Sequence, residues 1–187
     1  MEEFNTYEKA EDLFRRVDGL GENNCIFLSY TDTAKYMKSN GFLVTIGVVG
    51  CVIGGIMAGA IGGAIVGGIV GAIACFTGGA SSANKKCDGY LINWSEKGLG
   101  FIPLKATGAM LLLSPEKLKA DTASYFFLGY DQLESISIKN FNIFNSSVKN
   151  VNIAIKNNQN MYMLARVAEK EIPYQKYSSN RFFDRFK

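Results

Sequence analysis

The sequence contains no histidine among its 187 residues, and this absence excludes several kinds of chemistry. Histidine-dependent catalytic triads, imidazole acid–base catalysis and histidine metal sites all need that side chain. Two carboxylates, Asp131 and Glu134, lie near each other, but no nucleophile or base accompanies them, and a turn leading into a strand explains both. We therefore predict that the protein is not an enzyme and uses no cofactor.

Closely spaced cysteines are also missing. The four cysteines, Cys25, Cys51, Cys75 and Cys87, lie far apart and form no CxxC pair. Zinc sites and disulfide frameworks need cysteines at characteristic spacings. We interpret all four as reduced thiols and expect no bound metal.

Charged residues are absent from one long stretch, residues 41–84, which is rich in Ile, Val and Ala. Thirteen of the twenty glycines lie between Gly41 and Gly79. A helix without a polar face is not stable at a protein surface in water, so the stretch is typical of a membrane segment. Two alternatives stay open: a buried hairpin in a soluble core, and a linker, although linkers are richer in polar residues.

The length of this stretch predicts a hairpin. One helix from Phe42 to Gly79 would be roughly 57 Å long, nearly twice the thickness of a hydrocarbon core. Two spans fit if the chain reverses near residues 60–64, where glycines give the backbone freedom to turn. Lysines flank the stretch on both sides, which predicts that both ends face the cytoplasm. We therefore expect a membrane protein with cytoplasmic termini.

Small residues recur along the stretch at four-residue intervals, a spacing that lets two helices pack closely within a membrane. The expected helix-packing residues are Gly47, Gly55, Gly59, Gly63, Gly67 and Gly71. The spacing resembles the glycine zipper of small membrane and pore-forming proteins. The packing could occur within one chain or between chains, the latter giving a homo-oligomer.

The two flanking regions differ in charge. Residues 1–40 carry eight acidic and five basic residues, whereas residues 85–187 carry nine acidic and fifteen basic residues. No basic run is dense enough to indicate nucleic-acid binding. A mildly basic domain beside anionic lipid would be attracted to it.

The first forty residues predict a short amphipathic helix and a strand. Asn5 and Glu8 resemble a capping box, and Gly19 follows the last apolar residue of the helical pattern. The expected apolar face consists of Tyr7, Ala10, Leu13, Phe14 and Val17. We expect this helix to pack on the domain that follows, and residues 25–30 to form a strand.

After residue 85 the pattern changes to short strands and a closing helix. Alternating residues predict one hairpin over 90–104 and another over 151–167. Further apolar runs lie at 109–113, 125–130 and 135–144. A helix is expected over 173–187, with Tyr177, Phe182, Phe183 and Phe186 on one face. We interpret Trp94 and the aromatic residues of 125–130 as core rather than as an exposed binding patch.

Four segments carry a resemblance to a known family: GYLINWSEKGLGFIPL as an opening hairpin, YDQLESISI before the middle strands, VNIAIKNNQNMYML as a late hairpin and PYQKYSSNRFFDRF as a closing helix. In these the region resembles a bacterial pleckstrin-homology-like (PH/GRAM-like) domain. The resemblance implies a small barrel capped by a C-terminal helix, and a binding or assembly role rather than catalysis. The strand at 25–30 could belong to the same barrel, with the apolar stretch inserted after it.

The sequence thus predicts an α+β protein in which a PH-like β-barrel or sheet, capped by a C-terminal helix, accompanies a glycine-rich transmembrane helical hairpin. The expected segments are 1–40, 41–84 and 85–187. The expected function is that of a membrane-anchored binding or scaffold protein recognising a protein partner or the bilayer surface, and the alternative is a membrane-active oligomer such as a pore-forming or immunity protein. Candidate membrane-surface contacts are Lys85, Lys86, Lys97 and Lys105.

Overall fold

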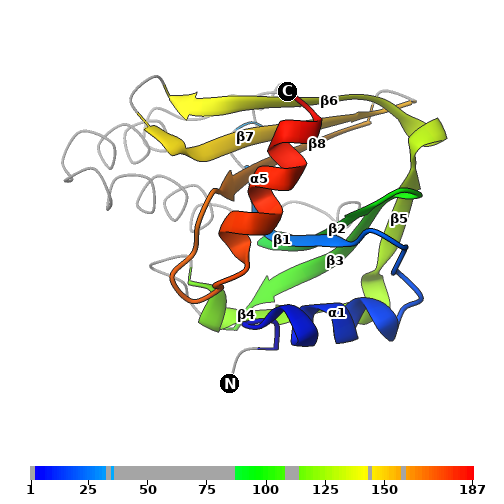
Figure 1. Cartoon of the computed structure of the whole chain (residues 1–187), viewed down its shortest axis with the longest axis vertical. Coiled ribbons are helices and arrows are strands. Elements are labelled where there is room, and N and C mark those ends of the chain that lie inside the picture. Colours follow the sequence, from blue (N-terminus) through cyan, green and yellow to red (C-terminus); the bar gives the residue numbers. More distant parts are fainter. Residues whose placement is uncertain (1–2, 33–34, 36–86, 108–113, 143–144, 157–158) are drawn as a thin grey trace, which may run out of the picture.

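The computed structural model describes residues 3–32, 35, 87–107, 114–142, 145–156 and 159–187. Within these ranges the chain forms an eight-stranded antiparallel sheet, two α-helices and three short 3-10 helices (Figure 1). The elements are α1 (Tyr7–Arg15), β1 (Cys25–Thr31), β2 (Gly89–Ser95), β3 (Gly98–Ala106), η1 (Pro115–Lys117), β4 (Leu118–Ala120), η2 (Thr122–Ser124), β5 (Phe126–Gly129), η3 (Tyr130–Gln132), β6 (Leu133–Asn142), β7 (Asn145–Ile155), β8 (Gln159–Arg166) and α5 (Gln175–Arg185).

The strands follow the order β4-β3-β2-β1-β8-β7-β6, and β5 also pairs with β3. Both predicted hairpins are confirmed, because β2 pairs with β3 and β7 pairs with β8, each in antiparallel register. The turn between β2 and β3 ends at Gly98, whose φ of +147° is a conformation that side-chain-bearing residues rarely adopt. β1 pairs with β2 over six residues although residues 32–88 separate the two strands in sequence.

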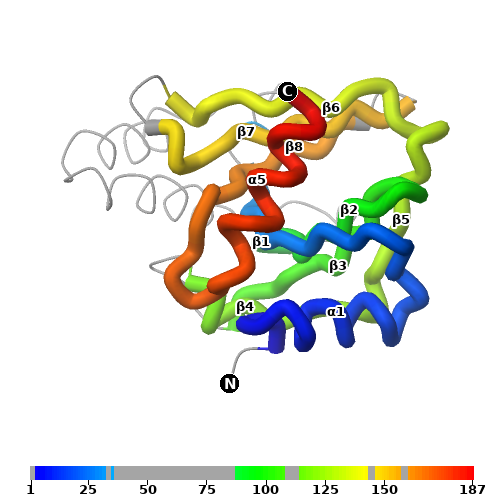
Figure 2. The backbone as a smooth tube through the Cα atoms, in the orientation of Figure 1, coloured from blue at the N-terminus to red at the C-terminus, as the bar shows by residue number. Residues whose placement is uncertain are grey.

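β1 is buried on both faces, and its sequence reflects this. Ile26 and Leu28 lie in a core cluster with apolar residues of α1, whereas Phe27 lies in a second cluster with Phe182 and Phe183 of α5. Helix α1 therefore covers one face of β1–β3, and α5 packs against the opposite face (Figure 2). A strand covered on both faces has no exposed polar positions, which explains its continuous apolar run.

Helix α1 lies close to its predicted position. Its N-cap is Thr6 rather than Asn5, and the Thr6 hydroxyl accepts a hydrogen bond from the Lys9 backbone N–H at 3.4 Å. Ala10, Leu13 and Phe14 are buried, which confirms the prediction that this helix packs on the domain.

Helix α5 buries most of the predicted face, with one exception. Phe182 and Phe183 are buried as expected, but Tyr177 is 70% exposed, so the prediction for Tyr177 was wrong. At 3.6 residues per turn the buried phenylalanines share their face with three polar residues, which are Gln175, Ser178 and Ser179. Apolar periodicity could not identify a buried face that is half polar.

These polar residues bind the sheet where two of its strands separate. Backbone pairing between β1 and β8 covers only two residue pairs, at Tyr30 and Thr31. Beyond them the Gln175 side chain bridges the strands: Oε1 accepts from the Leu28 N–H at 2.8 Å, and Nε2 donates to the carbonyls of Leu28 at 2.9 Å and Arg166 at 2.8 Å. The Gln175 carboxamide thus makes the hydrogen bonds that a backbone peptide group would make between two paired strands.

A buried polar cluster lies at the same junction. The Tyr30 hydroxyl donates to Glu169 Oε1 at 2.7 Å, and Arg166 Nη1 donates to Glu169 Oε2 at 3.0 Å. Burial raises the pKa of Glu169 above its ordinary value, although Arg166 and Tyr30 oppose this shift. Burial likewise raises the pKa of Tyr30, so its hydroxyl remains a donor.

The predicted fold class and membrane localisation need correction. No helix in the described ranges is both long and apolar enough to cross a bilayer. The described helices α1 and α5 have nine and eleven residues, about half of what a span needs, and each has a polar face. The architecture found is mainly an antiparallel sheet, so the fold predicted around a transmembrane helical hairpin was wrong. The stretch at 41–84, on which the hairpin and the membrane localisation rested, lies outside the described residues.

Candidate functional site

A cavity of about 510 Å³ opens between the β2–β3 hairpin, the loop before β1, η3 and the C-terminal half of α5. This volume lies within the range of roughly 300–1,000 Å³ that is typical of ligand sites. The cavity is lined by Asn23, Trp94, Ser95, Glu96, Tyr130, Arg181 and Arg185. These residues come from four parts of the chain, so the site exists only in the folded protein.

Two aromatic side chains form the apolar wall. Trp94 Nε1 donates to the Tyr130 hydroxyl at 2.5 Å, and that hydroxyl donates to the Ser95 carbonyl at 2.8 Å. The Trp94 ring also packs edge-on against Phe182 and Phe186, with ring centroids 6.3 and 5.9 Å apart. Trp94 is therefore held from two sides and presents a fixed surface to the cavity.

Two arginines form the basic wall. Arg181 and Arg185 are one helical turn apart on α5, so their side chains extend from the same exposed face. Among the described residues neither guanidinium forms an ion pair with a carboxylate. The Arg181 guanidinium lies 5.6 Å from the centre of the exposed Tyr177 ring. Both charges are therefore available to an anionic ligand.

The third wall carries a carboxylate of fixed position. Glu96 accepts hydrogen bonds from the backbone N–H groups of Glu22 at 3.0 Å and Asn23 at 3.2 Å. The hydrogen bond from Glu22 is the main reason why the pKa of Glu96 lies below its ordinary value. Glu96 is therefore ionised at neutral pH.

A buried asparagine holds the loop that supplies these N–H groups. Asn93 is 1% exposed, and its Nδ2 donates to the Gly19 carbonyl and to Asn24 Oδ1, both at 2.9 Å. Its Oδ1 accepts from the Cys25 N–H at 3.1 Å. A polar residue with this many partners can be buried without a large penalty. The loop wall of the cavity is therefore anchored to β2.

The described residues near the cavity contain no reactive thiol. Burial raises the pKa of Cys25 to about 11, so the thiol stays protonated at neutral pH, and its Sγ donates to the Ser178 carbonyl at 3.0 Å. Burial also raises the pKa of Cys87. In the described part of the chain no group of three or more His, Cys, Asp or Glu residues could hold a metal ion. The arrangement is suited to binding.

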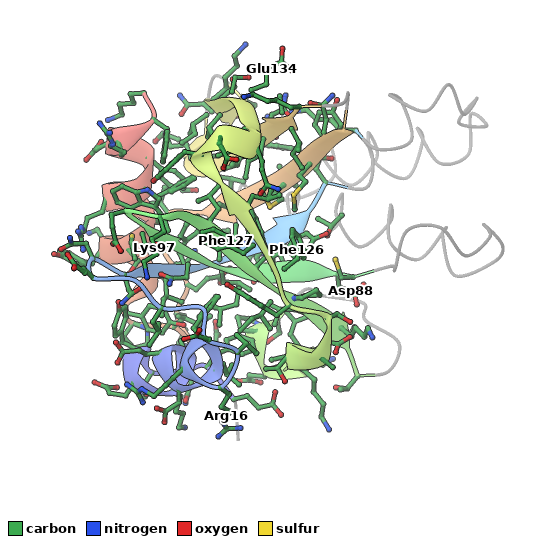
Figure 3. The ribbon with its side chains drawn as sticks, turned by 90° about the vertical axis from the view of Figure 1, so that its right-hand side faces the viewer. Arg16, Asp88, Lys97, Phe126, Phe127 and Glu134 are labelled. Carbon is green, nitrogen blue, oxygen red and sulfur yellow. The ribbon has the colours of Figure 1, made fainter. Side chains whose placement is uncertain are left out.

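The two candidate membrane contacts within the described ranges, Lys97 and Lys105, do not come together. Lys97 lies in the β2–β3 turn, whereas Lys105 lies near the other end of β3, roughly 25 Å away along the strand. Figure 3 shows this separation, with Lys97 at one end of the hairpin and Asp88, whose N–H donates to the Leu104 carbonyl, at the other. Lys105 is also paired with Asp121 at 2.6 Å. Lys85, Lys86 and the six helix-packing glycines lie outside the described residues.

The aromatic residues of 125–130 were predicted to be core, but in the structure they differ in how exposed they are. Phe126 stacks on Phe101 with ring centroids 4.8 Å apart, but Phe127 and Tyr130 are each 41% exposed. Tyr130 and Trp94 belong to the cavity, and sequence reasoning missed both. The spacing of Arg181 and Arg185 on a helical face was the one available signal of this site.

Compared with protein-family models, curated proteins and solved structures, the chain gives no match. The resemblance to PH-like domains and to glycine zippers therefore stays a prediction.

Proposed function

We propose that the protein is a binding module that recognises an acidic segment of a partner protein at the Trp94–Arg181–Arg185 cavity, and that it acts by binding rather than by catalysis. The observation that carries the proposal is the pair of arginines, Arg181 and Arg185, beside the fixed aromatic surface. Arginine binds carboxylates in a planar, two-pronged geometry, and aromatic side chains supply contact area at low entropic cost.

The dimensions of the site also support a peptide. A cavity of about 510 Å³ holds one or two side chains, and the exposed Tyr177–Arg181 pair continues the basic face along α5. A partner segment with carboxylates at successive positions would meet both guanidiniums. The alternative function of a membrane-active oligomer rested on glycines outside the described residues, and nothing at the cavity favours it.

Trp94 is the only tryptophan of the chain, so its fluorescence reports on the cavity alone. The experiment is a titration of the full chain with capped hexaglutamate, with capped hexalysine as the opposite-charge probe. We expect hexaglutamate to change the Trp94 emission, with an affinity that falls as salt is raised. Hexalysine should leave the emission unchanged.

The decisive variant is Arg181→Gln combined with Arg185→Gln. Charge-assisted hydrogen bonds contribute about 1.5–3 kcal/mol each, so losing one from each arginine should lower the affinity for hexaglutamate by about a hundredfold or more. The matched control is Arg15→Gln combined with Arg16→Gln, which removes the same charge at the C-terminal end of α1, from two residues that do not line the cavity. Equal loss in both double variants, or no response of Trp94 to hexaglutamate, would overturn the proposed function.

A further inference from the structure

The cavity contains a negative charge as well as two positive ones, and this arrangement bears on which anion it accepts. Glu96 lines the same cavity as Arg181 and Arg185. An acidic residue beside a binding site for acidic ligands reduces their attraction. Its charge therefore affects which anions the cavity favours.

The loop before β1 fixes the position of this charge. The Glu96 carboxylate is held by two backbone N–H groups, at 3.0 Å from Glu22 and 3.2 Å from Asn23. A Cβ atom added to Gly21 would lie 2.7 Å from Glu96 Oε1, so the backbone approaches the carboxylate closely. Glu96 therefore cannot swing across to neutralise the arginines without giving up these hydrogen bonds.

The three charged side chains leave the cavity with a net charge of +1. Replacing one carboxylate of the bound segment by a phosphoryl group changes the charge at that position from −1 to close to −2 at neutral pH. The second charge of a phosphoryl group is repelled by Glu96 and finds no additional cation among the lining residues.

We infer that Glu96 is a specificity-determining residue that makes the cavity selective for carboxylates over phosphoryl groups, so that the partner segment is recognised in its unphosphorylated, acidic form. This inference rests on the proposed function, because it concerns the same arginines. It goes beyond that function in one respect, which is that phosphorylation within the bound segment weakens the complex.

The experiment compares two capped peptides in the Trp94 fluorescence assay, hexaglutamate and the same peptide with one central Glu replaced by phosphoserine. At pH 7.5 the wild-type protein should bind the phosphopeptide about threefold more weakly. Glu96→Gln keeps an acceptor oxygen for the Glu22 N–H and should bind the phosphopeptide at least as well as hexaglutamate. Glu116→Gln removes the same charge from an exposed residue of η1 that does not line the cavity, and should keep the wild-type preference.

A change of pH separates charge selection from a structural role of Glu96. The second ionisation of a phosphoserine has a pKa of about 6, so at pH 5.5 the phosphoryl group is mostly a monoanion. The wild-type preference for hexaglutamate should then disappear, and Glu96→Gln should show no such change.

Three results would count against the inference, and they differ in whether they also overturn the proposed function. Tighter binding of the phosphopeptide by the wild-type protein, or an equal effect of Glu96→Gln on both peptides, overturns the selectivity and leaves the proposed function in place. Absence of any Trp94 response to either peptide overturns both.

Discussion

The two halves of the sheet differ in how completely their faces are covered by helices. In β1–β3 both faces are covered, one by α1 and the other by α5, and almost every residue of β1 and β3 is buried. In β6 and β7, by contrast, no two neighbouring residues are buried, and β6 has no buried residue at all. Only β8, which lies next to β1, still has three buried residues in a row, Met163, Leu164 and Ala165. A doubly covered strand is therefore sensitive to substitution at every position, whereas a singly covered strand is sensitive at every second position.

The largest effects should come from neighbouring core residues. Phe27→Ala and Leu28→Ala remove fully buried side chains on opposite faces of β1, and each should lower the free energy of unfolding by about 3–4 kcal/mol. In β7, Ile153→Ala should cost a similar amount, but its neighbour Asn152→Ala less than about 1 kcal/mol. Urea unfolding of the four variants measures this. The comparison fails if Leu28→Ala is as mild as Asn152→Ala.

The next largest effect tests the junction of the two halves. Gln175→Ala removes the partner of the Leu28 N–H and of two carbonyls, and should destabilise the protein by about 3 kcal/mol because buried polar groups lose their hydrogen bonds. Gln132→Ala is the matched control, since its single hydrogen bond to Gly129 is exposed. Thermal or urea unfolding distinguishes them, and equal losses would show that the bridge contributes little.

The pH dependence of stability probes the same junction. Because the folded-state pKa of Glu169 is raised, its contribution is fully present below the ordinary pKa of 4.5 and is lost as the pH rises through the folded value. The stability of the wild type relative to Glu169→Gln should therefore fall as the pH is raised above about 4.5 in urea titrations. Glu134→Gln, at an exposed position of β6, serves as the charge control. A relative stability that rises with pH would contradict the prediction.

The smallest expected effect concerns α1, the helix that covers one face of β1–β3. Thr6→Ala removes the N-cap of α1, and because its hydrogen bond to Lys9 is long, the cost should be about 0.5 kcal/mol. Ser135→Ala, exposed on β6, should change stability less than this. Far-UV circular dichroism during unfolding reports both, and a larger loss would mean that α1 depends on its cap more than on its buried face.

Local pattern predicted the elements of the fold better than their assembly. The hairpins β2–β3 and β7–β8 follow from alternating residues, with a glycine-containing turn in the first and a polar turn in the second, and α1 follows from five apolar residues on one helical face. The exposure of Tyr177 could not be predicted, because the buried face of α5 is partly polar. Its residues Gln175 and Ser178 have hydrogen-bond partners in β1, far away in sequence. The bridge between β1 and β8 escaped prediction for the same reason.

The cavity shows a second limit of sequence reasoning. Its lining residues lie between Asn23 and Arg185, and no short motif connects them. Trp94 and Tyr130 were interpreted as core because aromatic residues in strands usually are, yet their polar atoms hydrogen-bond to each other at the rim. The membrane prediction, by contrast, came from a single continuous segment. It took the composition of residues 41–84 and extended its consequence to the whole protein.

The Gln175 bridge also has a consequence for how the chain folds. Leu28 and Gln175 are separated by 147 positions, so the contact that completes the sheet between β1 and β8 is among the least local in the molecule. Closing so long a loop is slow compared with forming either hairpin. β1 is synthesised before α5. Its residues that pack against α5, such as Phe27, therefore stay exposed until α5 has formed. The junction should therefore be the last part of the sheet to form.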